Sequence, residues 1–218
     1  MRPCNQLFSA TALVVLASVA GCKSDGGATG PTTLEGQYHG AMAGESSPSL
    51  SASFNLTVAA STTGTITPLG AAPIAVTGTY VASTKVVTVS GGGFTIAGTI
   101  DDTGKLLGTY TRSATEGTVV AYQHTTANPV TVFCGTYSGD AAGIWNTVVR
   151  GTSLSGVYDN VDGSDGDFTG SVNGSNVSIT AVAYSPGVTG SGTISGTTMS
   201  GTLSGGGFAV TWNGDRTC

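Results

Sequence analysis

The chain has 218 residues, of which 35 are glycine and only 9% are charged, and its formal net charge is −5. The few Lys and Arg residues form no cluster, which argues against a nucleic-acid-binding protein. A glycine-rich composition can indicate disorder, but here large apolar residues recur at every second position. We therefore expect ordered β-sheet, in a chain long enough for one large or two small domains.

The first residues have the organisation of an export signal. Arg2 supplies a positive charge, and an apolar run over 10–20 is interrupted only by Thr11 and Ser18. The run is shorter than the about 20 apolar residues that span a bilayer. It is typical of a cleavable secretory segment, so residues 1–21 are predicted to be a signal peptide.

The end of this segment carries a more specific motif. Val19-Ala20-Gly21-Cys22 resembles the bacterial lipobox, a branched apolar residue followed by two small residues and Cys. The resemblance implies that Cys22 is lipidated and anchors the exported protein in the cell envelope. Lys23 stands where the lipoprotein family uses Asp to retain proteins at the inner membrane, which implies the outer membrane. An ordinary signal peptide with Cys at its boundary is the open alternative.

Residues 22–33 contain no large apolar side chain and are expected to form a flexible tether behind the lipid. Removal of the signal peptide discards Cys4, and Cys22 carries the lipid, so two cysteines remain. Disulfides persist outside the cytoplasm. We therefore predict that Cys134 and Cys218 are bonded and tie the first strand of a second domain to its last. The alternative is a pair of free thiols.

From residue 34 onward the sequence alternates apolar and polar residues, which is typical of strands with one buried face. No stretch after the tether has a sustained helical period. Turn signals separate the apolar runs and predict an antiparallel meander. These signals are Asp101-Asp102-Thr103-Gly104, Asp162-Gly163, Asn173-Gly174 and Asn213-Gly214.

An internal repeat sets the domain count. The segment 36–40, Gly-Gln-Tyr-His-Gly, matches 135–139, Gly-Thr-Tyr-Ser-Gly. Three further matches follow in the same order: Thr77-Gly78 with Thr169-Gly170, Gly98-Thr99-Ile100 with Gly192-Thr193-Ile194, and Gly108-Thr109-Tyr110 with Gly201-Thr202-Leu203. The segment Ser-Gly-Gly-Gly-Phe recurs at 90–94 and 204–208 but falls at different places in the two copies. We place the domains at 34–123 and 133–218, joined by a linker over 124–132.

The predicted fold is therefore all-β. It consists of two tandem small antiparallel meander barrels of about eight short strands each, after a signal peptide and a tether. One larger barrel or a β-sandwich is the alternative. The Gly-aromatic-Gly opening at 36–40 and the eight-strand meander resemble small calycin-type barrels of the avidin-like and lipocalin-like families. This resemblance is architectural, and no motif carries binding residues over.

Motifs of catalysis are missing from the sequence, so we expect no enzyme and assign no catalytic residue. His39 and His124 are expected to be solvent-facing strand residues. The densest polar segment is 159–167, where Asp159, Asp162, Asp165 and Asp167 present oxygens that suit Ca²⁺. A plain hairpin turn explains the same segment and is favoured, so calcium stays the alternative and no other cofactor is expected.

The aromatic residues leave two functions open. Tyr38, Tyr137, Trp145 and Trp212 either fill the barrels or line a ligand cavity. The first reading predicts a membrane-anchored bacterial envelope lipoprotein with a non-catalytic structural, adhesion or partner-binding role. The second predicts a small-ligand-binding β-barrel lipoprotein, holding an apolar molecule or a sugar. Expected partners are the membrane, through the lipid anchor, and an unidentified protein, glycan or small molecule.

Overall fold

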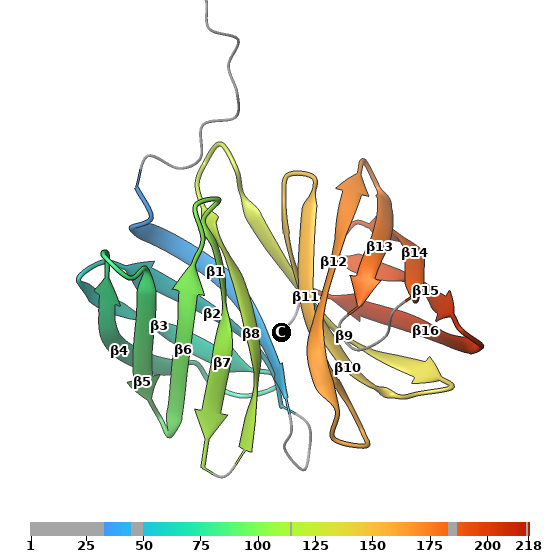
Figure 1. Cartoon of the computed structure of the whole chain (residues 1–218), viewed down its shortest axis with the longest axis horizontal. Coiled ribbons are helices and arrows are strands. Elements are labelled where there is room, and N and C mark those ends of the chain that lie inside the picture. Colours follow the sequence, from blue (N-terminus) through green and yellow to red (C-terminus); the bar gives the residue numbers. More distant parts are fainter. Residues whose placement is uncertain (1–32, 45–49, 114, 183–186, 217) are drawn as a thin grey trace, which may run out of the picture.

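A computed structural model describes residues 33–44, 50–113, 115–182, 187–216 and 218. These residues form two closed antiparallel barrels that lie side by side, each built from eight strands (Figure 1). The prediction of two tandem meander barrels is confirmed, in place of one larger barrel or a sandwich. The predicted signal peptide, the lipidation residue Cys22 and nearly all of the tether lie outside the described residues. Within the described ranges, no helix has the length and apolar character needed to cross a bilayer.

In each barrel every strand pairs with the next one along the chain, and the last strand closes on the first. The strands of the first barrel are β1 (Gly36–Gly44), β2 (Leu50–Val58), β3 (Ser61–Pro68), β4 (Ile74–Val81), β5 (Val86–Gly91), β6 (Phe94–Ile100), β7 (Lys105–Arg112) and β8 (Thr115–His124). Those of the second are β9 (Val130–Gly139), β10 (Gly143–Arg150), β11 (Ser153–Asn160), β12 (Asp165–Asn173), β13 (Asn176–Val182), β14 (Thr189–Ser195), β15 (Thr198–Gly205) and β16 (Phe208–Asp215).

The repeat matches fall on corresponding strands of the two barrels. Thr77-Gly78 and Thr169-Gly170 lie on the fourth strand of each barrel, and the next two matches lie on the sixth and seventh strands. The recurrence of Ser-Gly-Gly-Gly-Phe has a local cause instead. Both copies form a tight hairpin turn with two consecutive glycines at positive φ, Gly92 and Gly93 in one and Gly206 and Gly207 in the other. This segment therefore marks a turn type and not an equivalent position in the repeat.

Two boundaries differ from the sequence prediction. The linker between the barrels is shorter than 124–132, because His124 ends β8 and Val130 already begins β9. The Asn213-Gly214 pair was predicted as a turn but lies inside β16. A Cβ atom on Gly214 would lie 2.3 Å from the carbonyl oxygen of Cys134 on the neighbouring strand. The glycine therefore permits close strand approach and does not make a turn.

Large apolar side chains pack the interior of the first barrel. Those with an exposed fraction of 0% include Tyr38, Phe54, Leu56, Ile66, Ile96, Ile100, Leu106 and Tyr110. Glycines on neighbouring strands make room for the rings. Gly40 pairs with Phe54 across β1 and β2, and a Cβ atom on Gly40 would lie 2.3 Å from that ring. The apolar side chains that alternate along β2 therefore point inward and help to fill a solid barrel core.

The two barrels are joined by a second apolar cluster outside both interiors. From the first barrel it contains Ala41 and Ala43 on β1 and Val120 and Tyr122 on β8. The second barrel contributes Val130, Val148 and Val157. These strands are buried on both faces, whereas β4 and β16 alternate between buried and exposed residues. The interface therefore fixes the two barrels against each other.

Buried polar side chains cross this interface. Asn146 on β10 is fully buried, and its amide nitrogen donates to the backbone oxygen of Met42 at 2.6 Å. The hydroxyl of Ser51 donates to the Asn146 side-chain oxygen at 2.9 Å. The hydroxyl oxygens of Tyr122 and Ser155 are 2.8 Å apart. Directional bonds of this kind select one orientation of the barrels, which apolar contacts alone do not.

Candidate functional site

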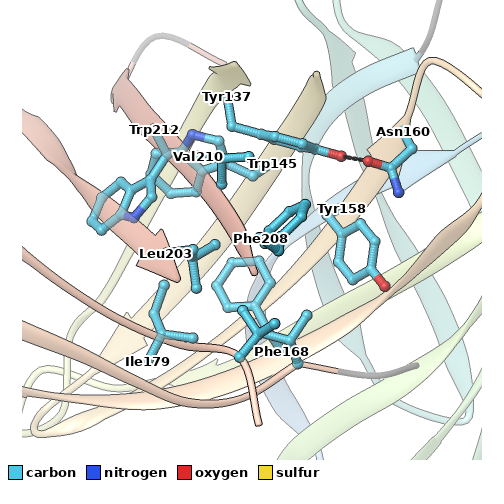
Figure 2. A pocket seen from close by; sticks show the side chains of 12 residues that line it. Tyr137, Trp145, Tyr158, Asn160, Phe168, Ile179, Leu203, Phe208, Val210 and Trp212 are labelled. Atoms are coloured by element: carbon cyan, nitrogen blue, oxygen red, sulfur yellow. Dashed lines mark hydrogen bonds between the residues drawn. The ribbon is translucent and has the colours of Figure 1, made fainter. Parts of the chain in front are cut away.

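The second barrel contains a cavity of about 90 Å³ that is partly open to solvent (Figure 2). Six aromatic side chains from five strands dominate its wall. The lining residues are Tyr137, Trp145, Tyr158, Asn160, Phe168, Ile179, Val182, Val188, Leu203, Phe208, Val210 and Trp212. In Figure 2 the two tryptophans lie on one side of the cavity, with Tyr158 and Asn160 on the other. An aromatic-lined hollow with few polar groups is the usual form of a small-molecule site.

Two inward positions carry smaller residues in the second barrel than in the first. The repeat alignment places Gly190 where the first barrel has Ile96, which is fully buried in its core. Gly190 on β14 pairs with Ile179 and Leu203, which both line the cavity. The Leu203 side chain lies over this position, because a Cβ atom on Gly190 would be 2.8 Å from it. Leu203 itself stands where the first barrel has the larger Tyr110, so two inward positions carry less side-chain volume in the second barrel.

Small differences in burial fit this explanation. Side chains around the cavity such as Tyr137, Trp145 and Phe168 retain 5 to 8% of their surface exposed. Tyr38, which corresponds to Tyr137 in the repeat, retains none. We conclude that the two copies of the repeat share a fold but differ in the packing of their interiors.

The two tryptophans are held in different ways. Trp212 on β16 lies across glycines of β15 and β14, because a Cβ atom on Gly201 or Gly192 would lie 2.4 or 2.5 Å from its ring. Trp145 meets Trp212 edge-on, with ring centroids 5.1 Å apart. Its indole nitrogen donates to the carbonyl oxygens of Thr136 and Asn213 at 3.1 and 3.2 Å. The glycines on β14 and β15 therefore create the flat wall on which the Trp212 indole rests.

Polar groups lie on the other side of the cavity. The Tyr137 hydroxyl donates to the side-chain oxygen of Asn160, and the Asn160 amide nitrogen donates to the Ser164 hydroxyl at 2.7 Å. Burial, followed by the neighbouring Tyr158, raises the pKa of Tyr137 above its ordinary value. Its phenol is therefore neutral at physiological pH. The cavity wall has no charged side chain among its described residues, which favours an uncharged ligand.

The structure brings together three of the four aromatics named from the sequence. Tyr137, Trp145 and Trp212 line the cavity. Tyr38 lies in the first barrel, fully buried, and its hydroxyl donates to the backbone oxygen of Leu34 at 2.8 Å. Tyr38 therefore fills a core, while its repeat partner Tyr137 borders a hollow.

Sequence reasoning missed Tyr158, Asn160, Phe168 and Phe208 as cavity residues. The alternation of apolar and polar residues along each strand can show which side chains point inward. It cannot show whether those side chains fill the barrel or leave a cavity. The usable signals were the replacements of Ile96 by Gly190 and of Tyr110 by Leu203 in the repeat alignment.

The acidic segment forms the hairpin between β11 and β12, as the turn interpretation predicted. Asp162 is at its tip, where its carboxylate accepts from the backbone nitrogen and hydroxyl of Ser164 at 3.0 and 2.8 Å. Asp165 accepts from Thr118 of the first barrel at 3.1 Å, and Asp159 is buried. Across the ranges that the structure describes, no three His, Cys, Asp or Glu side chains are grouped to hold a metal ion. Calcium binding by Asp159, Asp162, Asp165 and Asp167 stays a prediction from the sequence alone.

Cys134 and Cys218 lie at disulfide distance, with Cα atoms 5.3 Å apart, as the sequence predicted. Cys134 is on β9, at the seam where the first and last strands of the second barrel pair. The bond ties the final residue to this seam, and the C-terminus lies between the two barrels (Figure 1). Its place is outside the cavity, so its role is to hold the barrel closed.

His39 and His124 lie on the paired strands β1 and β8 and are half-buried, not solvent-facing as predicted, because their rings stack with centroids 4.1 Å apart. The backbone nitrogen of Val130 donates to Nδ1 of His124 at 3.0 Å, which secures the start of β9. Burial, followed by the neighbouring His124, lowers the pKa of His39. The parallel stack packs the rings against each other, which is not how two imidazoles direct nitrogens at one metal ion.

The chain matches no protein-family model and no curated protein in the comparisons made with its sequence.

Proposed function

We propose that this protein is a membrane-anchored bacterial envelope lipoprotein whose second barrel binds a small, uncharged, largely apolar molecule. The observation that carries the proposal is the aromatic cavity of the second barrel. It favours the small-ligand alternative over a purely structural or adhesive role. The role is non-catalytic, because the cavity wall offers neither a nucleophile beside a base nor a charged acid–base pair among its described residues.

Anchor, tether and barrels follow one another along the chain in an order that suits this role. The lipid on Cys22 holds the protein to the membrane, and the short tether leads into the first barrel. The first barrel has a solid core and packs rigidly on the second. It therefore acts as a spacer that carries the binding barrel away from the lipid surface.

We expect the protein without its first 22 residues to bind toluene, and a cavity-filling substitution to abolish that binding. Leu203 lines the cavity, so Leu203→Phe introduces a larger side chain into the cavity wall. The affinity for toluene, followed by chemical-shift changes of cavity methyl groups, is expected to fall at least about tenfold because the ring occupies the site.

Leu107→Phe is the matched control. Leu107 is 41% exposed on the first barrel, so the same substitution there leaves the cavity unchanged. Equal toluene binding by both variants, or no binding by the parent protein, would contradict the proposed function. Retained near-ultraviolet circular dichroism shows that each variant is folded.

The anchor is tested separately in cells. Cys22→Ser is expected to move the protein from the membrane fraction to the soluble fraction or to leave it as uncut precursor, because the hydroxyl of Ser does not carry the lipid. Ser18→Ala, within the same signal segment, is the control and is expected to stay in the membrane fraction. Membrane retention of a cleaved Cys22→Ser protein would rule out lipidation as the anchor.

A further inference from the structure

Both histidines of the chain lie at the junction of the two barrels. The sequence contains two histidines, His39 and His124, and their rings stack on each other with centroids 4.1 Å apart. His39 shares a face of β1 with Ala41, and His124 shares a face of β8 with Tyr122, because residues two apart on a strand point the same way. The pair therefore extends the apolar cluster between the barrels toward the linker over 125–129.

His124 holds the start of the second barrel through an unprotonated ring nitrogen. The backbone N–H of Val130 donates to Nδ1 of His124 at 3.0 Å, and an imidazole nitrogen accepts only when it carries no proton. Val130 begins β9 and belongs to the apolar cluster between the barrels. The bond therefore ties the last strand of the first barrel to the first strand of the second, and it requires the neutral form of His124.

The stacked arrangement disfavours positive charge on the pair. Two imidazolium rings with centroids 4.1 Å apart would place like charges in contact. Burial, followed by the neighbouring His124, lowers the pKa of His39, and a hydrogen bond with the Val130 backbone opposes these two effects. Because the rings interact, a proton on one of them makes protonation of the other more difficult.

The side chains around the pair bring more positive than negative charge. His39 lines an open groove of about 340 Å³ with Arg216 and the disulfide-bonded Cys218, and the described residues of this groove include no Asp or Glu. Tyr122 pairs with His39 across β1 and β8, and its ring centroid lies 4.4 Å from the Arg150 guanidinium. The charged side chains on the elements around the pair are Glu35, Lys105, Arg150 and Arg216. Three of these four are cationic, which favours neutral imidazoles, and the open groove gives solvent access to the rings.

From this geometry we propose that the histidine pair is an acid-sensitive contact between the barrels. Both rings are neutral while the contact is closed. Uptake of a solvent proton at Nδ1 of His124 removes the acceptor of the Val130 N–H and places a positive charge against His39 and beside Arg216. The junction then loosens at its linker end, whereas the bonds of Asn146 to the first barrel contain no titrating group. This proposal goes beyond the binding function, because it concerns how the second barrel is held.

An acid titration of the protein without its first 22 residues tests the proposal. Between pH 7.5 and 5.0 we expect the hydrogen-exchange protection factor of the Val130 amide to fall at least about tenfold, the effect of losing one hydrogen bond. Ordinary Asp and Glu carboxylates stay ionised above about pH 5, so histidines are the side chains that change charge in this range. The ring resonances of His39 and His124 are expected to shift over the same pH range as the Val130 amide.

The direction of the effect follows from the lowered pKa of His39. The unfolded chain takes up this proton more readily than the folded protein, so the folded state loses stability as the pH falls below about 6.5. The Ile96 amide, in the core of the first barrel, is the internal reference for global unfolding. Its protection factor is expected to fall much less than that of Val130, because the proposed loosening is local.

His124→Asn separates the hydrogen bond from the titration. Asn offers an acceptor oxygen close to the position of Nδ1 and does not titrate, so the Val130 protection factor of this variant is expected to be the same at both pH values. His39→Asn is the matched control, because it removes the other ring and leaves His124 to titrate. We expect His39→Asn to retain the loss of Val130 protection in acid.

Three results would overturn the proposal. They are rings that stay neutral down to pH 5.0, Val130 protection that persists after the His124 ring has taken up a proton, and an equal loss of protection in the parent and His124→Asn. The first two are measured on the parent protein and hold even if a variant fails to fold. None of these measurements uses the cavity, so toluene binding and the proposed function are decided separately.

Discussion

The Cys134→Ser/Cys218→Ser double variant is expected to lose about 2–4.6 kcal/mol from the free energy of unfolding of the second barrel. The two cysteines are 84 residues apart in sequence, and a cross-link over so long a loop removes much of the conformational entropy of the unfolded chain. The upper figure is the full chain-entropy value for this loop, and the lower one is typical of measured disulfides. The seam between β9 and β16 is where we expect unfolding of the variant to begin, because only strand pairing then holds it.

Both tryptophans of the chain lie in the second barrel, so the measurement is selective. A urea titration followed by tryptophan fluorescence reports the second barrel, and its midpoint is expected to fall in the double variant. Reduction of the parent protein is expected to give the same shift, and reduction of the variant none. Coinciding midpoints for the oxidised parent and the variant would show that the bond contributes no stability.

The fold was predictable because its determinants are local. Alternation along segments such as 54–58 sets which face is buried, and Asp162-Gly163 and Asn173-Gly174 fix hairpins within a few residues. The repeat then supplied the domain count. The error at Asn213-Gly214 arose because glycine serves two purposes that look alike in sequence, a tight turn and close strand approach.

The cavity was harder to predict because it depends on side-chain volume summed across a closed barrel. Trp212 and Tyr110 both occupy inward positions of alternating strands, yet only Trp212 borders a hollow. The second barrel has Gly190 and Leu203 where the first has the larger Ile96 and Tyr110, and the pairing of Gly190 with Leu203 is known only once the register is known.

The sequence of β8 also contains a signal of the interface between the barrels, which an analysis of single strands does not explain. Val119-Val120-Ala121-Tyr122 on β8 is a continuous apolar run, and it is buried on both faces. Such a run indicates a strand covered on both sides, as in a sheet sandwiched between layers. Which element covers the second face is a long-range matter, and here it is the other barrel.

The contact between the barrels leads to the second large effect, which we expect from Asn146→Ala. Asn146 is fully buried and bonds to Met42 and Ser51 of the first barrel. Its removal takes away the extra bond to the Met42 carbonyl and leaves the Ser51 hydroxyl without its acceptor in the interface, at a cost of about 1–3 kcal/mol. Asn213→Ala, at an exposed position of β16, removes the same amide without burying an unpaired group and is expected to change stability by less than about 0.5 kcal/mol.

Loss of the interface bonds is expected to uncouple the barrels as well as destabilise them. Calorimetry of the parent protein is expected to give one transition, and Asn146→Ala to broaden or split it, because each barrel has a closed sheet and a core of its own. Ser51→Ala, alone and with Asn146→Ala, completes a double-mutant cycle whose coupling we expect to exceed about 0.5 kcal/mol. Additive effects together with an unsplit transition would mean that the barrels are held by the apolar cluster alone. The first barrel would then hold the second barrel through Val120, Tyr122 and Val148, with no directional bond to set its orientation.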